Sequence, residues 1–346
     1  MTVSASTAAG RATDRPRWRS ALCPYPEEDQ GDPFLVEAPP DAGVVARYYV
    51  YVSAEGFPVY AGDDLADASS WRRIGESCPG LGRDPWCWAP CVRYIPGLAR
   101  PWVMLYSRGA GAGDPAGHQH HQIRRADAAR PEGPFRDSGE VLTPDLDFSI
   151  DPDVRVLPDG RLRLLFATDF VVDEPLGTGL VEADVDDELR RLTSALTVVA
   201  RGHADWQVFD PQRSMPWKDV PGVQWDRGDT VRWTTLEGPA ACTSPAGRPV
   251  VLYSGGNFTG RYGVGMVVEE ASGQWHDVTA SGDHLVLAPH PEVGLVGPGH
   301  CSVLTAPDGS TFLCYHFRPA PGEPRQFTVM ALLWDADTDE PYVDLS

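Results

Sequence analysis

The sequence predicts an all-β protein folded as a five-bladed β-propeller, with four-stranded antiparallel blades around a central cavity. The main observation is a pattern that occurs five times along the chain. Each copy begins with a head residue one or two positions from a Pro or Gly, continues as an alternating apolar run, and reaches a second, aromatic-rich run after a turn. The five heads are Asp32, Trp88, Asp151, Glu237 and His300. Because the innermost strands of a propeller begin near its axis, we expect these heads to surround one cavity.

The spacing of the heads supports this architecture. Successive heads are roughly 55 to 85 residues apart, and propeller repeats of the kelch type are about 50 residues long. A β-sandwich, or a pair of β domains, is the alternative architecture. It gives no reason for a polar residue to recur at the start of each copy.

The runs within each copy have the composition of strands. They are short, alternate in polarity, and are rich in Val, Tyr, Phe and Trp. The 35 Gly and 33 Pro punctuate the whole chain rather than one linker. Asp159-Gly160 and Asp308-Gly309 each join two runs, which predicts a hairpin turn at both places.

The chain divides into a flexible N-terminal arm over residues 1–29 and a single propeller domain over residues 30–346. An insertion at about residues 200–232 lengthens one copy, and we expect it to form a wall of the cavity. It contains Trp206, Trp217 and Trp225. Residues 185–200 are the one predicted helix, because leucines recur there at helical spacing. These are Leu189, Leu192 and Leu196.

Composition excludes several classes of function. The formal net charge is -20, from 29 Lys and Arg against 49 Asp and Glu. The chain therefore has no basic footprint for binding nucleic acid, and its negative charge would repel anionic membrane surfaces. No apolar stretch approaches the roughly 18 residues of a membrane helix. The N-terminus has no apolar signal segment, which predicts a cytoplasmic protein. Its seven Cys are then expected to be reduced thiols, and the oligomeric state stays open.

Some Asp-Pro dipeptides of the chain contain candidate site residues, whereas others are only turns. Asp-Pro alone is a turn signal, and it occurs at Asp32, Asp84, Asp114, Asp151 and Asp210. Asp32 and Asp151 differ from the others because each leads directly into a strand-like run. Asp114 and Asp210 lie in loop-like surroundings, where a structural role suffices.

Taken in order, the five heads and their neighbours resemble the motifs of glycoside hydrolase family 43. The motifs are Gly-Asp32-Pro-Phe, Trp88-Ala-Pro, Ser-Ile-Asp151-Pro-Asp-Val, Leu-Glu237-Gly-Pro-Ala and Gly-Pro-Gly-His300-Cys-Ser-Val. The resemblance extends over about residues 30 to 345. It implies a five-bladed propeller that cleaves xylosides or arabinosides with inversion.

The resemblance also implies a role for each carboxyl group. Asp32 matches the general base, Glu237 the general acid, and Asp151 the third carboxylate that orients the acid and raises its pKa. An inverting hydrolase needs such an acid and base about 6.5–9.5 Å apart, so that a water fits between them and the sugar. Asp147 and Asp153 lie close to Asp151 in the sequence and are its rivals.

Three further residues match positions of the family around the sugar. Trp88 is expected to shape the sugar pocket, since sugars present apolar C–H faces to aromatic rings. Arg325 is expected to donate hydrogen bonds to sugar hydroxyls. His300 is a substrate contact or a ligand of a central cation such as calcium. No cofactor is required, apart from this possible calcium ion.

The chain departs from the resemblance at three cysteines. Cys91 follows the Trp-Ala-Pro motif, Cys301 follows His300, and Cys242 follows the Glu237 motif. We expect these thiols to make the floor of the pocket less polar.

The leading hypothesis is an exo-acting, inverting hydrolase of β-xylosides or α-L-arabinofuranosides that binds a small glycoside or short oligosaccharide. The alternatives are a propeller repurposed for a non-carbohydrate small molecule, such as an intracellular tailoring or cyclising enzyme, and a non-catalytic sugar-binding propeller.

Overall fold

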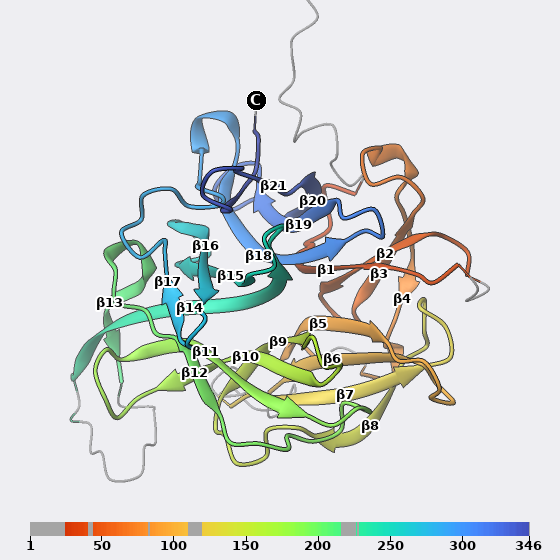
Figure 1. The fold of residues 1–346 in the computed structure, drawn as a ribbon, viewed down its shortest axis with the longest axis horizontal. Coiled ribbons are helices and arrows are strands. Elements are labelled where there is room, and N and C mark those ends of the chain that lie inside the picture. The colour runs from red at the N-terminus through yellow and green to blue at the C-terminus, as the bar shows by residue number, and fades with distance from the viewer. Residues whose placement is uncertain are drawn as a thin grey trace, which may run out of the picture.

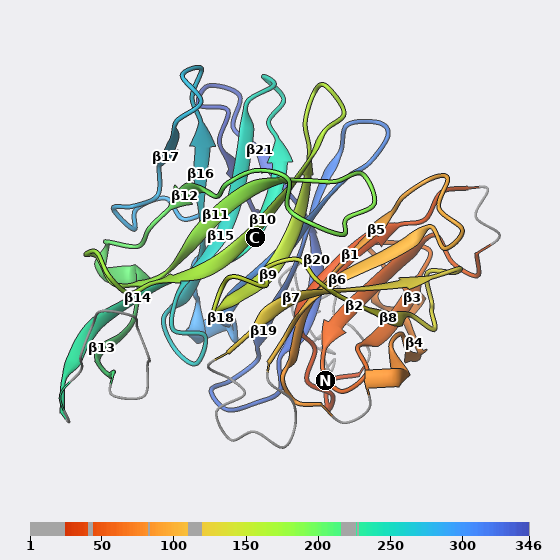
Figure 2. The same ribbon diagram turned by 90° about the horizontal axis from the view of Figure 1, so that it is seen from below.

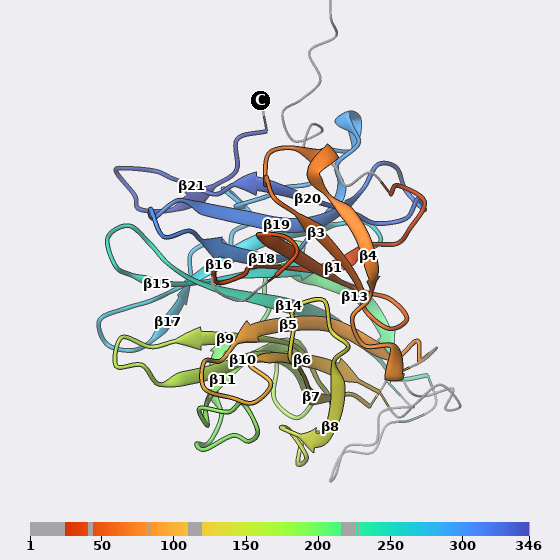
Figure 3. The same cartoon turned by 90° about the vertical axis from the view of Figure 1, so that its right-hand side faces the viewer.

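Five blades of β-strands follow one another around a ring, which confirms the predicted all-β propeller (Figure 1). The computed structural model describes residues 25–40, 44–81, 84–109, 120–215, 226 and 228–345. The innermost strands are β1 (Gly31–Glu37), β5 (Cys87–Tyr94), β9 (Ser149–Val156), β14 (Thr230–Thr243) and β18 (Val296–Thr305). Each contacts the innermost strand of the next blade, and β18 closes the ring against β1 (Figure 3).

The remaining strands complete the blades in chain order. Blade one adds β2 (Tyr48–Ser53), β3 (Pro58–Gly62) and β4 (Arg72–Glu76); blade two adds β6 (Trp102–Arg108), β7 (Gln122–Ala128) and β8 (Arg136–Val141). Blade three adds β10 (Leu162–Phe170), β11 (Gly177–Val185) and β12 (Thr197–Ala200); blade four adds β15 (Pro249–Gly256), β16 (Tyr262–Glu269) and β17 (Trp275–Asp277). Blade five adds β19 (Thr311–Arg318) and β20 (Gln326–Ala331). Four blades therefore have the four strands that were predicted, and blade five has three among the described residues.

The other elements are short. The strand β13 (Val208–Ser214) pairs with the first part of β14, which also pairs in parallel with β11 of blade three, and the free end of this pair projects outward (Figure 2). The strands β21 (Leu333–Trp334) and β22 (Pro341–Tyr342) form a small hairpin near the C-terminus. Single 3-10 turns occur at Ala68–Ser70, Pro79–Leu81, Asp205–Gln207 and Pro291–Val293. None of the described residues forms a helix long and apolar enough to cross a membrane.

The hydrophobic core lies between neighbouring blades rather than at the axis. One cluster joins blades one to three and includes Tyr51, Leu105 and Leu164, all fully buried. A second joins blades four and five around Leu252 and Leu313. Because apolar side chains fill these interfaces, polar residues remain for the strand ends that face the axis.

Every innermost strand carries a β-bulge at its head, at the same register in all five blades. One residue of each bulge has a left-handed backbone conformation. These residues are Asp32 (φ 52°), Ala89 (φ 48°), Asp151 (φ 60°), Gly238 (φ 54°) and His300 (φ 44°). A left-handed non-glycine residue costs about 1–3 kcal/mol and persists only where its surroundings hold it. The bulge turns each head toward the axis.

A hydrogen bond from each bulge to another blade holds this conformation. The N–H groups of Ala89, Asp151 and His300 donate to the hydroxyls of Ser53, Ser107 and Ser254, at 2.7, 2.9 and 2.6 Å. Each serine ends or nearly ends the second strand of the preceding blade. In blade one the acceptor of the Asp32 N–H is His316 Nδ1, at 3.1 Å, and in blade four the acceptor of the Gly238 N–H is Asp151 Oδ2, at 3.0 Å.

Both predicted hairpin turns are confirmed. Gly160 (φ 85°) joins β9 to β10, and Gly309 (φ 87°) joins β18 to β19. The predicted helix over residues 185–200 is wrong, because this segment is a turn followed by β12. Leu189 is fully buried in the turn whereas Leu196 is 39% exposed, so the leucines do not share one face.

The two other segments singled out in the sequence lie partly outside the described residues. Of the arm, residues 1–24 are not described, and Tyr25 packs on the ring of Tyr60 with 5.7 Å between the ring centroids. Of the insertion, residues 216–225 and 227 are not described, which includes Trp217 and Trp225. Its described part contains β13 and Trp206, whose indole N–H donates to the carbonyl oxygen of Thr279.

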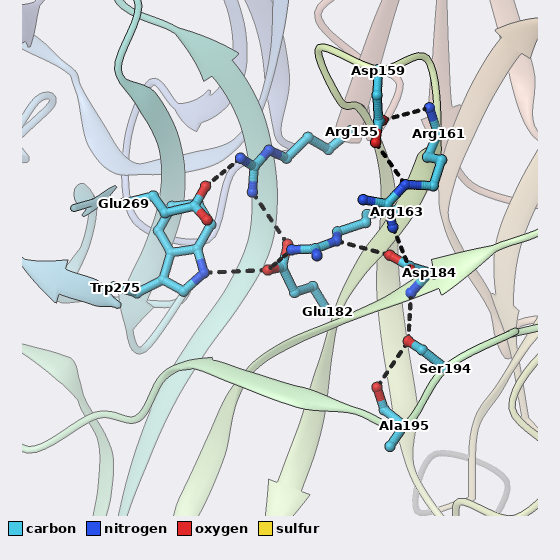
Figure 4. A network of polar contacts seen from close by, with 10 residues as sticks. All are labelled: Arg155, Asp159, Arg161, Arg163, Glu182, Asp184, Ser194, Ala195, Glu269 and Trp275. Carbon is cyan, nitrogen blue, oxygen red and sulfur yellow. Dashed lines mark hydrogen bonds and ion pairs between the residues drawn. The ribbon is translucent and has the colours of Figure 1, made fainter. Parts of the chain in front are cut away.

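Blades three and four are joined by a buried network of charged groups (Figure 4). Glu182 on β11 is 2% exposed and contacts Arg163 at 2.7 Å and Arg155 at 3.4 Å. Arg155 also pairs with Glu269 of blade four and stacks over the ring of Trp275. The Trp275 indole N–H donates to Glu182. One buried carboxylate therefore anchors two guanidinium groups and a strand of the next blade.

Replacing Glu182 by Gln is expected to lower the free energy of unfolding by about 3 kcal/mol, because it leaves Arg155 and Arg163 without their shared anion. Urea denaturation measures this change. The control is Glu188→Gln, which removes a carboxylate from an exposed pair with Arg190 and should cost less than about 1 kcal/mol. Equal losses in the two variants would contradict the role given to the buried network.

Candidate active site

A cavity of about 440 Å³ lies at the head end of the innermost strands, and all five blades contribute to its lining. This volume is within the range of about 300–1,000 Å³ that is typical of pockets for small ligands. All six site residues predicted from the sequence line it: Asp32, Trp88, Asp151, Glu237, His300 and Arg325. The structure therefore brings together side chains that are up to 293 residues apart in the chain.

Asp32 lies among cationic and hydrogen-bonding groups. Its Oδ1 is 3.0 Å from Arg325 Nη1 and 3.3 Å from His300 Nδ1. Burial by itself raises the pKa of this carboxyl group, but His300, Arg325, His316 and the Ser53 hydroxyl together outweigh burial and lower it below the usual value. Asp32 is therefore ionised at neutral pH and can accept a proton.

Glu237 lies in the opposite electrostatic situation. Burial raises its pKa to about 7, and the negative charge of Asp32 adds to this effect. The Tyr262 hydroxyl donates to Glu237 Oε1 at 2.7 Å and opposes the shift without cancelling it. Glu237 can therefore hold a proton near neutral pH and deliver it to a bound ligand.

Asp151 is the third carboxyl group and is 5% exposed. Burial, Glu237 and Asp32 raise its pKa well above the usual value, although the Gly238 N–H that it accepts acts in the other direction. That hydrogen bond ties Asp151 to the residue directly after Glu237. The rivals lie elsewhere, since Asp147 is exposed and Asp153 pairs with Arg93 at 2.6 Å away from the lining of this cavity.

Two histidines lie on the blade-five side of the cavity. Burial lowers the pKa of His300, and it lowers the pKa of His316 still further, so both rings are neutral at pH 7. Because His316 Nδ1 accepts the Asp32 N–H, its ring proton is on Nε2. This buried Nε2 has no hydrogen-bond partner among the described residues, which leaves a donor for a ligand or a water.

Arg325 reaches the cavity because two neighbours make room for it and hold it. A Cβ on Gly31 would be 1.8 Å from Arg325 Cζ, so any larger residue there would displace the guanidinium from this position. Asp29 pairs with Arg325 Nη2 at 2.6 Å and fixes the plane of the guanidinium. Part of the fork then faces the cavity, as hydrogen bonding to vicinal oxygens requires.

Aromatic side chains form two walls of the cavity. Trp88 lines the blade-two side, where its ring packs edge-on against His121 and its indole N–H donates to the Pro85 carbonyl oxygen. Phe258 lines the blade-four side and is 39% exposed. No described residue of the insertion lines the cavity, although Phe209 of β13 stacks on Phe258.

Among the lining residues that sequence reasoning missed are Asp29, Tyr262, His316 and Phe258. His316 ends the aromatic-rich run of the fifth copy, and its position corresponds to Ser53, Ser107 and Ser254 in the other copies; this correspondence was the available signal. Asp29 was assigned to the arm. No local motif marks Tyr262 or Phe258.

The donor set gives only partial support for a central cation. His300 Nδ1 is within 3.9 Å of Asp151 as well as close to Asp32, and a second cavity of about 10 Å³ lies beside these groups. However, the described residues contain no group of three or more His, Cys, Asp or Glu placed to hold a metal. Calcium takes six to eight oxygen ligands, so these residues do not complete such a site by themselves. The calcium ion stays a prediction.

None of the three unusual thiols, Cys91, Cys242 and Cys301, lines the main cavity. Cys301 lines the second, smaller cavity, and Cys91 is buried with its Sγ 3.8 Å from Asp153 Oδ1. Burial raises the pKa of Cys301 to about 12, so this thiol stays protonated. Cys87 is the one cysteine among the described residues that lines the main cavity.

Solved structures share this fold. A thermostable family-43 glycoside hydrolase is 23% identical, with a TM-score of 0.68 over 91% of this chain and 93% of that one. An endo-1,4-beta-xylanase from Bacteroides thetaiotaomicron is 21% identical, with a TM-score of 0.68 over 92% and 96%. An alpha-L-arabinanase from Cellvibrio cellulosa, complexed with arabinohexaose, is 19% identical, with a TM-score of 0.62 over 92% and 96%. No curated protein sequence matches the chain.

The model of the glycosyl hydrolases family 43 matches residues 32–338. This range runs from Asp32 to beyond the last strand of blade five. It includes Asp32, Asp151 and Glu237 together with the aromatic and cationic side chains around them. The chain therefore belongs to glycosyl hydrolase family 43.

Proposed function

We propose that the protein is an exo-acting, inverting glycosidase that releases a terminal pentose from β-xylosides or α-L-arabinofuranosides. The observation that carries the proposal is the separation of two pKa values within one cavity. The pKa of Asp32 is lowered, whereas that of Glu237 is raised to about 7. An ionised base and a protonated acid are the two states that hydrolysis with inversion needs at its start.

In the proposed reaction, Asp32 takes a proton from a water while that water attacks the anomeric carbon. Glu237 gives its proton to the glycosidic oxygen as the bond to the anomeric carbon breaks. The products are a free sugar of inverted configuration and an alcohol, and the proton taken up by Asp32 returns through solvent to Glu237. Asp151 holds the backbone at Gly238 by accepting its N–H, and the negative charge of Asp32 favours the protonated state of Glu237.

The shape and lining of the cavity support a short substrate with a terminal sugar. Walls from all five blades surround the carboxyl groups, which favours a pocket with one mouth over a cleft open at both ends. Arg325 and His316 Nε2 offer hydrogen-bond donors to sugar hydroxyls, and Trp88 offers an aromatic face. These groups favour a carbohydrate over the non-carbohydrate ligand of the alternative hypothesis, and the carboxyl pair favours catalysis over simple binding.

The first test compares the wild type with Glu237→Gln on 4-nitrophenyl β-D-xylopyranoside, 4-nitrophenyl α-L-arabinofuranoside and the disaccharide of the sugar that is released. The variant should lose at least ~10²-fold in kcat on the disaccharide, because its alcohol leaves only when protonated. The loss on the nitrophenyl glycoside should be smaller, since nitrophenolate leaves more readily. Proton NMR of the first sugar formed should show inversion.

Asp147→Asn serves as the control, because Asp147 is the exposed rival of Asp151 and does not line the cavity. It should retain wild-type rates. If Glu237→Gln hydrolyses the substrates at the wild-type rate, Glu237 is not the general acid. Absence of hydrolysis by a folded wild-type protein on all three substrates would overturn the proposed function.

The pH dependence of kcat follows from the same pKa values. As pH rises through about 7, Glu237 loses the proton that it must donate, so kcat should fall on the alkaline side. Asp32 must be ionised, and its lowered pKa places the acid limb below about pH 4, the usual range of aspartate. A rate that rises through pH 7 would contradict this assignment. Steady-state kinetics from pH 3 to about 9 measures the alkaline limb and shows whether the acid limb lies below about pH 4.

A further inference from the structure

Phe258 is a large aromatic side chain that the protein leaves 39% exposed at the wall of its cavity. It lies in the turn between β15 and β16, in the same blade as Glu237 and Tyr262. Tyr262 begins β16 and donates to Glu237. The wall on the Glu237 side of the cavity is therefore aromatic, and one of its rings is open to solvent.

The ring of Phe258 rests on a second aromatic ring. Phe209 of β13 stacks on it, with 6.3 Å between the ring centroids and 28° between the ring planes. The Asn257 side-chain amide donates to the Phe209 carbonyl oxygen at 3.0 Å and ties the turn to β13. Phe209 in turn packs on a small core of its own, formed by Leu176, Met215 and Trp233.

This support fixes Phe258 in place. The β13 strand pairs with β14, so the supporting ring belongs to the same sheet that carries Glu237. On the other side, a Cβ on Gly297 would be 3.0 Å from the Phe258 carbonyl oxygen, so blade five approaches the turn closely. A stacked, exposed ring held from two sides is a preorganised surface rather than a mobile loop residue.

The chemistry of the proposed function places the leaving group on this side. In an inverting reaction the water attacks from the Asp32 side and the leaving group departs toward Glu237. Asp32 belongs to blade one and Glu237 to blade four, which are not neighbours in the ring. The leaving group must therefore pass beside the turn that carries Phe258.

We propose that Phe258, supported by Phe209, forms the binding site for the first sugar ring of the leaving group. This inference rests on the proposed function and adds the residue that selects an oligosaccharide over a simple glycoside. The flat apolar C–H face of a pentose ring packs on the exposed face of Phe258. The described part of the insertion, β13, then serves substrate binding indirectly, through the ring that it places beneath Phe258.

The test compares two substrates of the wild type and of Phe258→Ala: the disaccharide and the methyl glycoside of the sugar that the wild type releases. The methyl leaving group has no ring to pack on Phe258. In Phe258→Ala, the ratio of kcat/KM on the disaccharide to kcat/KM on the methyl glycoside should fall about tenfold, mainly through a higher KM for the disaccharide. Phe258→Trp restores a flat face and should retain the wild-type ratio.

Tyr342→Ala is the control, because Tyr342 is 45% exposed and does not line the cavity. Phe258→Leu keeps apolar volume without a flat ring and should behave like Phe258→Ala, which separates stacking from a folding defect. An unchanged ratio in Phe258→Ala, in an enzyme whose activity depends on Glu237, would overturn this inference alone. If the wild type hydrolyses neither substrate, the proposed function fails and this inference fails with it.

Discussion

The hydrogen bond between blades at each bulged head is the constraint on which the site depends. Without it, a residue such as Asp32 or Asp151 would relax from its left-handed conformation, and its side chain would no longer be held toward the axis. A serine hydroxyl accepts this hydrogen bond in three of the five positions. Because this hydrogen bond joins neighbouring blades, the packing of the blades around the ring also determines where the carboxyl groups lie.

The two positions without serine are those that matter most for chemistry. His316 accepts the N–H of Asp32, and Asp151 accepts the N–H of Gly238, directly after Glu237. At both positions the hydrogen-bond acceptor is a side chain that lines the cavity, where the other three blades use a serine hydroxyl. This links the proposed base to His316 and the proposed acid to Asp151. It also explains how Asp151 can be buried and yet retain a hydrogen-bond donor.

The distribution of positive charge then separates the carboxyl groups. Arg325 is held by Asp29 beside Asp32, while the hydrogen-bond partner of Glu237 is the uncharged Tyr262. Burial acts on both groups in the same direction, but only Asp32 has a guanidinium within 3.0 Å. Opposite protonation states follow within one cavity. In the proposed function these states are those of the base and the acid.

Much of this arrangement could be predicted from the sequence, because each head combines a turn residue with the start of a strand. The sequence pattern did not predict which residue of each head occupies the left-handed position of its bulge. Asp32, Asp151 and His300 occupy the left-handed position of their bulges, whereas Trp88 and Glu237 lie one residue before it. The predicted helix failed because regular leucine spacing cannot distinguish a helix from a turn with one buried leucine. Asp29 joins the site through its ion pair with Arg325 of blade five, and Tyr262 through its hydrogen bond to Glu237 within blade four; no local sequence pattern encodes either contact.

The most direct test of the account is a titration of the carboxyl carbons by carbon-13 NMR, in wild type and Glu237→Gln. The account predicts that the Glu237 carboxyl group releases its proton near pH 7 in the wild type, and that this titration is absent from the variant. It also predicts that Asp32 stays ionised below the usual aspartate range of about pH 4. If Asp32, Asp151 and Glu237 titrate together near their ordinary values, the separation of acid and base is wrong.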